Sequence, residues 1–453
     1  MVLWLLAGVA GARAAGTNTL VWDTSQNQVS ADIRGEALWP LLEDIAHQTG
    51  WHIFVEPGAS QNASVKFRAL PEGVALKKLL GNLNFALVPQ TNSPNELYVF
   101  TTRMENATQR VVTKAVAKAK AMKHVAKQLL VKLKPGANID LIAKERHAKV
   151  VSRNDKLGIY LLEFDDEAAT AAALAGLQAS PDVAAVDFNY VYDPPVAAQP
   201  LASAPSGAGP VSLTLNPSTT TDPCNPIVGL IDTGMQSLGS QLNSFLLPSV
   251  NVTGDAADTS STTPTHATAM AQTILRAVSQ QSSSSSVRIL PVNVYGSGET
   301  ATTWNVALGV QAAVDGGATV LNMSMAGTTD SAVLDDIIQQ ALAKGIVIFA
   351  AAGNQPVSTP NYPAAISGVN AVTALGSANS LASYANYGSF VDMALPGASV
   401  VYLGNQAFVV QGTSASTAYA SGIAAGAKSS NCQSWSQIES AMMQKFPVPQ
   451  QNN

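Results

Sequence analysis

The sequence predicts an α/β protein in which a doubly wound, mainly parallel sheet over residues 224–446 follows two small α+β domains. Three observations predict this class. Short apolar runs alternate with helical patterns through the C-terminal half, residues 128–194 show a β-α-β-β-α-β order, and residues 18–103 mix helices with strands. A length of 453 residues also favours about three domains.

The first residues are typical of a secretory signal peptide. Residues 2–10 are apolar, and Ala12-Arg13-Ala14 offers an Ala-x-Ala cleavage site, so we assign 1–14 to the signal. No later segment reaches the roughly 20 apolar residues of a membrane helix. The sequence therefore predicts an exported protein, secreted or periplasmic, without a transmembrane segment.

Residues 18–103 are predicted to form the first folded domain. Helical apolar spacing runs from Ala37 to Gly50, and a second amphipathic helix from Val74 to Leu83. Strands are expected at 51–55, 65–68, 85–88 and 97–100. The pattern resembles the short N-terminal (STN) domain of secretins and TonB-dependent receptors, which implies a Gram-negative envelope and a protein partner there.

A basic, Ala-rich stretch over residues 104–127 follows and is interpreted as a solvated linker, helical from residue 110. The second small domain covers 128–194, with strands at 129–133, 150–152, 159–164 and 183–192 and helices at 139–147 and 167–178. This order predicts a ferredoxin-like fold. Residues 195–223 are rich in Pro, Ala, Ser and Thr and predict a flexible linker that receives a maturation cut.

The C-terminal region supplies the strands and helices of the parallel sheet. Strands are expected at 227–231, 287–292, 319–322 and 346–350, with helices at 267–278, 304–316, 332–344 and 415–426. Asp232 and Asn354 come just after strand ends, the edge at which such sheets place their sites. The region carries five Lys and Arg against ten Asp and Glu, which argues against a nucleic-acid surface.

Three residues of this region predict nucleophilic catalysis by serine. Asp232, His266 and Ser414 follow one another in that order, and a serine hydroxyl needs a base and a group that orients the base. Of five histidines only His266 lies in the C-terminal half. A single Asp-Thr-Gly argues against an aspartic protease, and the absence of Gly-x-Ser-x-Gly argues against an α/β-hydrolase.

These motifs, with their spacings of 34, 88 and 60 residues through Asn354, resemble the subtilisin-like serine protease (subtilase) family, peptidase family S8. The segments 320–327, 362–365 and 382–388 extend the resemblance over about residues 225–445. It implies that Asn354 and the Ser414 N–H stabilise an oxyanion. Ala267 and Ala418 depart from the family, which has Gly and Pro at these places.

The resemblance also implies where peptide substrate lies. It would extend between two edges, at Gly296, Ser297 and Gly298 and at Ser324, Met325, Ala326 and Gly327, although 296–298 also fits a plain surface turn. The small Ala351, Ala352 and Gly353 predict a roomy first pocket that takes apolar or aromatic side chains. Residues 128–194 resemble the subtilase propeptide, which implies an intramolecular chaperone and temporary inhibitor.

Cys224 and Cys432 bracket the protease-like region, and we weigh a disulfide against two free buried thiols. The sequence calls for no cofactor. Subtilases often bind calcium, but no ligand set is assignable, and Asp255, Asp258 and Asp392 are isolated candidates.

The predicted function is that of an exported serine endopeptidase made as a zymogen. Its partners would be a peptide or protein substrate, its own propeptide and an envelope protein, but no nucleic acid. The alternative is a catalytically weak or inactive subtilase-like module that binds peptides in the envelope, which Ala267 and Ala418 favour. Labelling by a fluorophosphonate separates the two.

Overall fold

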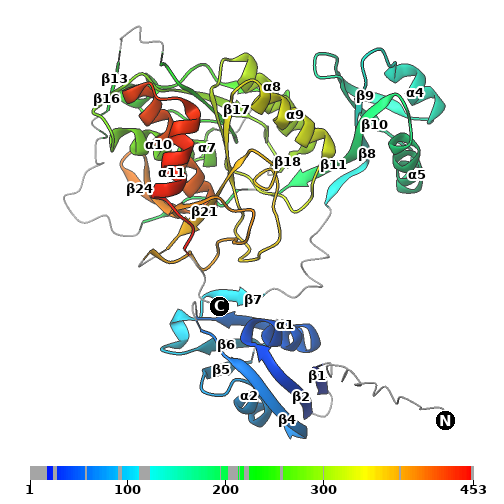
Figure 1. Cartoon of the computed structure of the whole chain (residues 1–453), viewed down its shortest axis with the longest axis vertical. Helices are drawn as coiled ribbons and strands as arrows, with labels where there is room; N and C mark the ends of the chain where they lie inside the picture. Colours follow the sequence, from blue (N-terminus) through cyan, green and yellow to red (C-terminus); the bar gives the residue numbers. More distant parts are fainter. Residues whose placement is uncertain are drawn as a thin grey trace, which may run out of the picture. The chain divides into compact units, whose positions relative to one another are not determined.

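The structure is a computed structural model of the whole chain, shown in Figure 1. It describes residues 18–23, 28–56, 59–89, 94–111, 123–193, 195–201, 213, 215–218, 224–255, 259–298, 300–376 and 379–449. The signal peptide predicted at 1–14 lies outside these residues. The chain divides into two compact units, residues 1–120 and 121–453, and each is described by itself.

The N-terminal unit packs two helices and two sheets around one apolar core. Its core includes Leu41, Ile45, Leu76 and Leu97, which are fully buried. One sheet has the order β1-β2-β4 and the other β5-β6-β3-β7. The elements are β1 (Thr19–Asp23), β2 (Gln28–Ala37), α1 (Leu38–Thr49), β3 (His52–Val55), β4 (Asn62–Pro71), α2 (Glu72–Leu79), β5 (Asn84–Val88), β6 (Glu96–Phe100), η1 (Met104–Asn106) and β7 (Gln109–Val111).

The predicted basic linker over 104–127 is partly structured, so the linker-helix prediction is wrong at both of its ends. Strand β7 pairs with β3 and closes the second sheet, and β8 already begins at His124. The Ala- and Lys-rich composition favours a helix, but pairing with distant strands overrides local propensity. Residues 112–122 of this stretch lie outside the described residues.

The second small domain has the predicted β-α-β-β-α-β order. Its elements are β8 (His124–Leu133), α4 (Ile139–Glu145), β9 (Lys149–Asn154), β10 (Ile159–Glu163), α5 (Glu167–Gln178) and β11 (Val183–Tyr192). The antiparallel sheet has the order β11-β8-β10-β9, and β18 (Ala301–Thr302) of the C-terminal region adds a strand beyond β11. This is the ferredoxin-like strand order.

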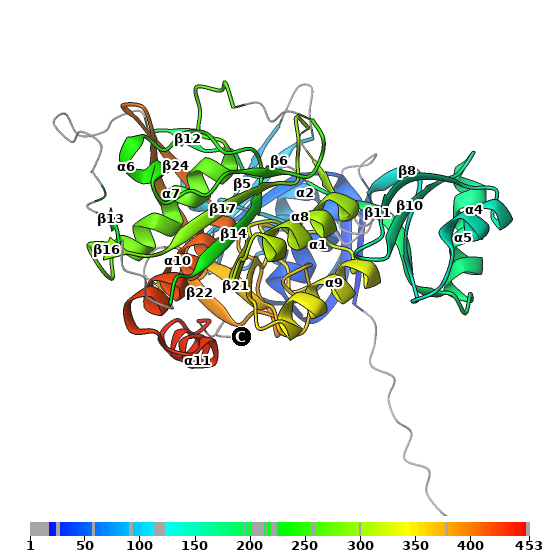
Figure 2. The same cartoon turned by 90° about the horizontal axis from the view of Figure 1, so that it is seen from above.

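The two faces of this sheet are covered by different parts of the chain (Figure 2). Leu129, Val131 and Leu162 face α4 and α5, whereas Leu130 and Leu161 join the core of the C-terminal region beside α8 and α9. Alternate residues of a strand point to opposite faces, so a single sheet serves both cores.

The C-terminal region is built on a seven-stranded parallel sheet of order β15-β17-β14-β19-β20-β21-β22. Its strands are short and almost wholly buried, as the apolar runs predict. They are β14 (Ile227–Asp232), β15 (Val250–Asn251), β17 (Arg288–Asn293), β19 (Val320–Met323), β20 (Val347–Ala351), β21 (Asn370–Leu375) and β22 (Met393–Pro396).

Helices cover both faces of this sheet and define two cores. One core joins the sheet to α7 (His266–Ser279), α10 (Thr413–Asn431) and α11 (Trp435–Lys445). The other joins it to α8 (Thr303–Asp315) and α9 (Ala332–Ala343). A short helix α6 (Ser240–Asn243) and the antiparallel hairpin of β23 (Ala398–Leu403) and β24 (Gln406–Gln411) complete the fold. The doubly wound α/β architecture is therefore as predicted.

The predicted flexible linker over 195–223 is anchored at two points, which corrects the expectation of a free tether. Strand β12 (Gln199–Pro200) pairs with β24, and β13 (Asn216–Pro217) pairs with β16 (Ser284–Ser285). Ala198 and Leu215 are buried in the apolar core beside α7 and α10. The composition of this segment favours a loop, but burial of Ala198 and Leu215 holds the chain in place next to β12 and β13.

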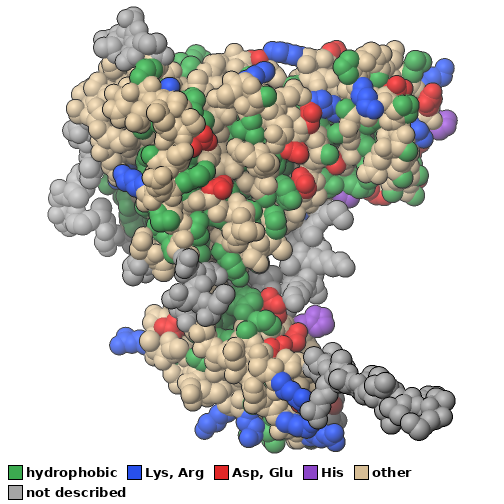
Figure 3. All heavy atoms as spheres, viewed as in Figure 1, with side chains coloured by type: hydrophobic (Ala, Val, Ile, Leu, Met, Phe, Trp, Pro, Cys, Tyr) green, Lys and Arg blue, Asp and Glu red, His purple; other side chains and the backbone are tan. Residues whose placement is uncertain are grey.

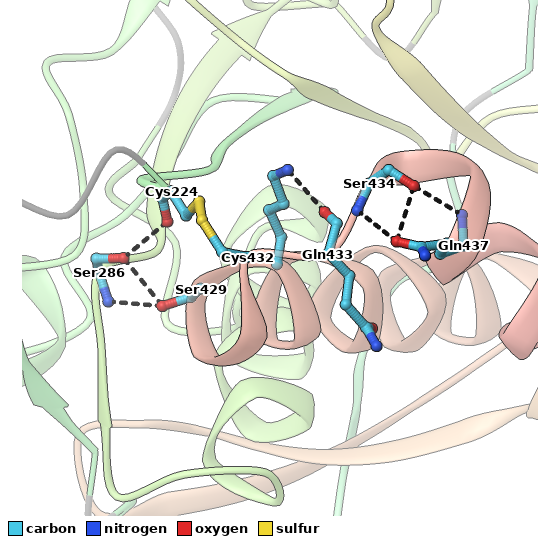
Figure 4. The surroundings of a disulfide bond; sticks show 8 residues. Cys224, Ser286, Ser429, Cys432, Gln433, Ser434 and Gln437 are labelled. Carbon is cyan, nitrogen blue, oxygen red and sulfur yellow. Dashed lines mark hydrogen bonds between the residues drawn. A yellow bond between two sulfur atoms is a disulfide. The ribbon is translucent and has the colours of Figure 1, made fainter.

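Cys224 and Cys432 are joined in a disulfide with Cα atoms 5.4 Å apart (Figure 4). Cys224 lies just before β14, and Cys432 ends α10 in the left-handed conformation. Ser429 on α10 also bonds Ser286, whose hydroxyl donates to the Cys224 carbonyl. These contacts tie the chain just before β14 to the end of α10, the helix whose first turn carries Ser414.

The visible face of the C-terminal region carries few charged side chains (Figure 3). The 12% of charged residues is low for a chain of this length, so most of this surface is small and polar or apolar. None of the helices in the described part of the chain combines the length and apolar character needed to span a bilayer.

Candidate active site

Asp232 and His266 form a buried pair at the carboxyl edge of the parallel sheet. Asp232 ends β14, and His266 is the first residue of α7. The His266 Nδ1 atom lies 2.8 Å from each carboxylate oxygen of Asp232, and the Thr233 N–H donates to Oδ1 at 2.7 Å. The carboxylate thus fixes the imidazole in one orientation. It leaves Nε2 buried and without a hydrogen-bond partner in the described chain.

Ser414 lies in the first turn of α10, where backbone N–H groups have no partner inside the helix. Its Oγ donates to the Ser324 carbonyl at 3.0 Å, and the Ser324 Oγ donates back to the Ser414 carbonyl at 3.1 Å. The expected hydrogen bond from Ser414 to His266 is not made. The Ser414 hydroxyl instead donates its hydrogen bond to the Ser324 carbonyl. The Ser414 side chain must therefore rotate before its hydroxyl can donate to His266.

Asn354 follows β20 and is held with its amide group oriented. The Asn354 Oδ1 accepts hydrogen bonds from the Thr413 N–H at 2.8 Å and the Thr413 hydroxyl at 3.1 Å. The amide nitrogen keeps no partner among the described residues. Gly412 (φ 143°) lets it approach, because a Cβ there would lie 3.1 Å from Nδ2. Thr413 was not singled out in the sequence, although it stands inside the serine motif.

The small residues predicted to line the first pocket lie next to these groups. Ala351 ends β20, and Ala352 and Gly353 are buried. Gly353 has φ 109°, and a Cβ there would lie 2.4 Å from the Asn361 amide nitrogen, so only glycine fits. The Gly353 N–H donates to the Thr413 hydroxyl at 3.1 Å, which joins this segment to the start of α10.

Of the two predicted substrate edges, the first, residues 296–298, is a turn and not a strand edge. Gly296, Ser297 and Gly298 form a turn in which the Gly298 N–H donates to the Tyr295 carbonyl at 3.0 Å. The edge that accepts an extended chain is the next segment, β18, which pairs with Val191 and Tyr192 of β11. The plain-turn alternative for 296–298 therefore describes these residues better than a strand edge does.

The second edge, Ser324 to Gly327, lies between the nucleophile and β11. Met325 is buried, and Ala326 is half-buried. Gly327 pairs with Tyr362, and a Cβ on Gly327 would lie 3.0 Å from the ring of Tyr192. The end of β11 thus lies against residues predicted to bind substrate.

The two departures from the family pattern are accommodated without distortion. Ala267 is buried and its N–H donates to the Thr233 hydroxyl at 3.0 Å. Ala418 is buried within α10, which runs unbroken from Thr413 to Asn431. Neither methyl group displaces the Asp232–His266 pair.

Strand β11 places two polar side chains at the N-termini of α8 and α9. The Asp187 carboxylate accepts from the Val333 N–H at 3.0 Å and the Ser331 hydroxyl at 2.9 Å. The Asn189 side-chain oxygen accepts from the Trp304 N–H at 3.1 Å. Burial raises the pKa of Asp187, and these hydrogen bonds oppose that shift.

Two ion pairs also join the second small domain to helices α8 and α9. Lys132 on β8 pairs with Asp336 on α9, and burial lowers the pKa of Lys132. Lys156 pairs with Asp315 on α8 at 2.6 Å, and this contact lowers the pKa of Asp315. Both ion pairs place a lysine of the small domain against an aspartate of the C-terminal region, so opposite charges meet at this interface.

The structure does not bring the isolated calcium candidates together. Asp255 follows β15 and Asp392 precedes β22, which are opposite edges of the sheet, and Asp258 lies outside the described residues. Within the described ranges, three or more His, Cys, Asp or Glu side chains nowhere gather in a group able to hold a metal.

Comparison with known proteins identifies the class that this fold and site define. The Subtilase family, Peptidase S8, matches residues 224–452, and the Fervidolysin N-terminal prodomain matches residues 110–189. The first match covers half of the chain, so the chain belongs to the subtilase family. We call residues 123–193 the prodomain from here on.

Individual relatives match the C-terminal region. The thermostable alkaline protease of Halalkalibacterium halodurans is 37% identical over 145 residues, covering 32% of this chain and 39% of the relative. Thermitase of Thermoactinomyces vulgaris is 36% identical over 156 residues, covering 34% of this chain and 56% of thermitase. The chain thus spans about two-fifths to three-fifths of the length of these relatives.

The fold is also found in a solved structure. Fervidolysin from Fervidobacterium pennivorans, a keratinolytic enzyme related to subtilisin, superposes with a TM-score of 0.54 at 19% identity. The likeness covers 70% of this chain and 57% of fervidolysin. It supports the arrangement of a prodomain and a subtilisin-like α/β domain.

Proposed function

We propose that this chain is a serine endopeptidase that hydrolyses peptide bonds through Asp232, His266 and Ser414. The observation that carries the proposal is the buried Asp232–His266 pair, whose free Nε2 atom belongs to a site that also contains Ser414 and an oriented Asn354 amide. Membership of the subtilase family supports the same assignment.

In the proposed reaction, the Ser414 side chain turns from the Ser324 carbonyl to His266 and attacks the substrate carbonyl. His266 takes the hydroxyl proton, and Asp232 stabilises the imidazolium. The Asn354 amide and the Ser414 N–H donate to the oxyanion. His266 then protonates the leaving nitrogen, and water hydrolyses the acyl-enzyme.

The proposed substrates are peptides with an apolar or aromatic side chain before the cut. Ala351, Ala352 and Gly353 are small and uncharged, which supports a pocket for an uncharged side chain. Peptide libraries should therefore disfavour Lys and Arg at this position, and a preference for either would contradict the proposal. No cofactor is required, and we assign no calcium ligands.

The enzyme would be made as an exported zymogen, secreted or periplasmic, that its prodomain keeps inactive. The contacts of β11 with α8, α9 and Gly327 support this role, because they place the prodomain beside the substrate edge. The His266 side chain is only 3% exposed, as expected of a closed precursor. The N-terminal unit has its own core, which supports a separately folded module, and we propose that this module binds an envelope protein.

Labelling with a fluorophosphonate tests the proposed activity. The matured wild-type protein should label and hydrolyse casein, Ser414→Ala should do neither, and Ser436→Ala should match the wild type because Ser436 is an exposed serine on α11. Equal labelling of wild type and Ser414→Ala would refute the assignment of the nucleophile.

A second candidate function is peptide binding without turnover. The hydrogen bond of Ser414 to Ser324 instead of His266 favours it, together with Ala267 and Ala418. A protein of this kind would bind peptides by fluorescence anisotropy, yet remain unlabelled and cleave nothing.

A further inference from the structure

The chain that leaves the prodomain is held on both sides of Ser414. On one side Val191 and Tyr192 pair with Thr302 and Ala301. The Tyr192 ring also lies against Gly327, three residues beyond the Ser324 carbonyl that binds the Ser414 hydroxyl.

On the other side, β12 pairs with β24, and β24 leads directly into Gly412 and Ser414. Seven residues from Tyr192 to Gln199 reach at most about 25 Å. The short connection between the two anchors therefore runs past Ser414.

The register of the second anchor shows which residues come nearest to Ser414. Gln199 pairs with Val409 and Pro200 with Phe408, so the same antiparallel register places Ala197 opposite Gln411. Gln411 is the last residue of β24, and α10 begins at Thr413. The residues just before Ala197 consequently lie beside the turn that carries Ser414.

The chemistry of the leaving nitrogen limits the choice of bond. His266 must protonate this nitrogen, and in the bonds that precede Pro194 and Pro195 the nitrogen belongs to a crowded proline ring. Of the four bonds between Asp193 and Ala197, which directly precede the residue opposite Gln411, two remain, Pro195–Val196 and Val196–Ala197. The Val196 residue is 49% exposed, whereas Pro195 is partly buried, so Pro195 better fits the residue whose side chain enters the pocket before the cut.

We infer that self-maturation cuts the Pro195–Val196 bond. The inference rests on the proposed serine endopeptidase activity. The Ser414 oxygen bonds to the Pro195 carbonyl carbon, the bond to the Val196 nitrogen breaks, and His266 passes the serine proton to that nitrogen. Water then hydrolyses the ester, which frees the Pro195 carboxylate and restores Ser414.

After this cut, the new carboxyl terminus of the prodomain and the new amino terminus of the enzyme would each lie next to a segment that stays attached. The prodomain would end three residues after Tyr192, which stays against Gly327. The enzyme would begin at Val196, and its first residues would stay attached through the buried Ala198 and the pairing of β12 with β24. The new amino terminus therefore starts beside the active site.

The test is intact mass and N-terminal sequencing of the full chain at early times after refolding. The wild type should yield fragments that end at Pro195 and begin at Val196, and Ser414→Ala should stay whole. Val196→Pro should block this cut because it places a proline ring on the leaving nitrogen. Val196→Leu is the matched control and should be cut as the wild type is.

The outcomes separate the inference from the proposed function. A first cut at Val196–Ala197, or anywhere beyond residue 201, would overturn the inference while the protease assignment stands. Cutting of Val196→Pro at the same bond would also overturn it, once circular dichroism shows the wild-type melting curve. A wild type that neither cuts itself nor takes a fluorophosphonate would overturn both.

Discussion

Replacing Asp187 by alanine should weaken the hold of the prodomain on the protease. The carboxylate accepts two hydrogen bonds at the N-terminus of α9, from Val333 and Ser331. Hydrogen bonds to a charged group contribute about 1.5–3 kcal/mol each, and the helix dipole adds to them. Burial of the carboxylate offsets part of this gain, as the raised pKa of Asp187 indicates.

We therefore expect a net loss of about 2 kcal/mol, which corresponds to a dissociation constant about 30-fold higher. The assay is dilution of the self-cut complex, followed by hydrolysis of a chromogenic peptide as the prodomain leaves. Asp182→Ala is the matched control, since Asp182 is exposed in a prodomain turn. An unchanged dissociation constant for Asp187→Ala would refute the docking role of this carboxylate.

The same contact predicts a pH dependence. Burial raises the pKa of Asp187 in the docked state, so docking takes up a proton between the ordinary and the raised pKa. The affinity of the prodomain should be highest below the ordinary carboxyl pKa and fall as the pH rises through the raised value. Asp187→Asn should flatten this slope. What remains would come from other groups of the interface, among them Asp330, whose pKa burial raises, and Asp315, whose pKa the pair with Lys156 lowers.

Three further predictions concern the catalytic region. Asn354→Ala should lower kcat about 10²- to 10³-fold with little change in KM, an effect of the size known for subtilisin itself. Gly412→Ala should also lower kcat, because its methyl group would lie 3.1 Å from the Asn354 amide nitrogen. Replacing Cys224 and Cys432 by serine opens a loop of 208 residues and should lower the free energy of unfolding by about 5 kcal/mol, measured in urea under oxidising conditions.

The sequence alone predicts the large elements well where pattern and packing agree. The runs that form β14, β19 and β20 are mostly apolar because both faces of a parallel sheet are covered. Helix α5 and strand β11 lie at the predicted bounds, since their caps and alternation are local. Asp232, His266 and Ser414 could be chosen because each stands in a short motif.

Local sequence patterns do not predict short strands and side-chain orientations that depend on residues far away in the chain. Strand β2 is an exception, because its buried Val29, Ala31 and Ile33 alternate with polar residues, and this local pattern indicates a strand that is absent from the predicted elements. Strands β7 and β12 are too short to show any period and exist only because β3 and β24 offer partners. The hydroxyl direction of Ser414 depends on Ser324, ninety residues away in the chain.

The parallel topology explains why inhibitor and catalytic groups meet. Each crossover helix begins near the carboxyl edge of the sheet, so α7 and α10 place His266 and Ser414 there from one face. Helices α8 and α9 begin at the same edge from the other face, and their N-termini bind Asn189 and Asp187. A strand that caps both helices must end at this edge. The residues after β11 are thereby led toward Ser414 without a dedicated inhibitory loop.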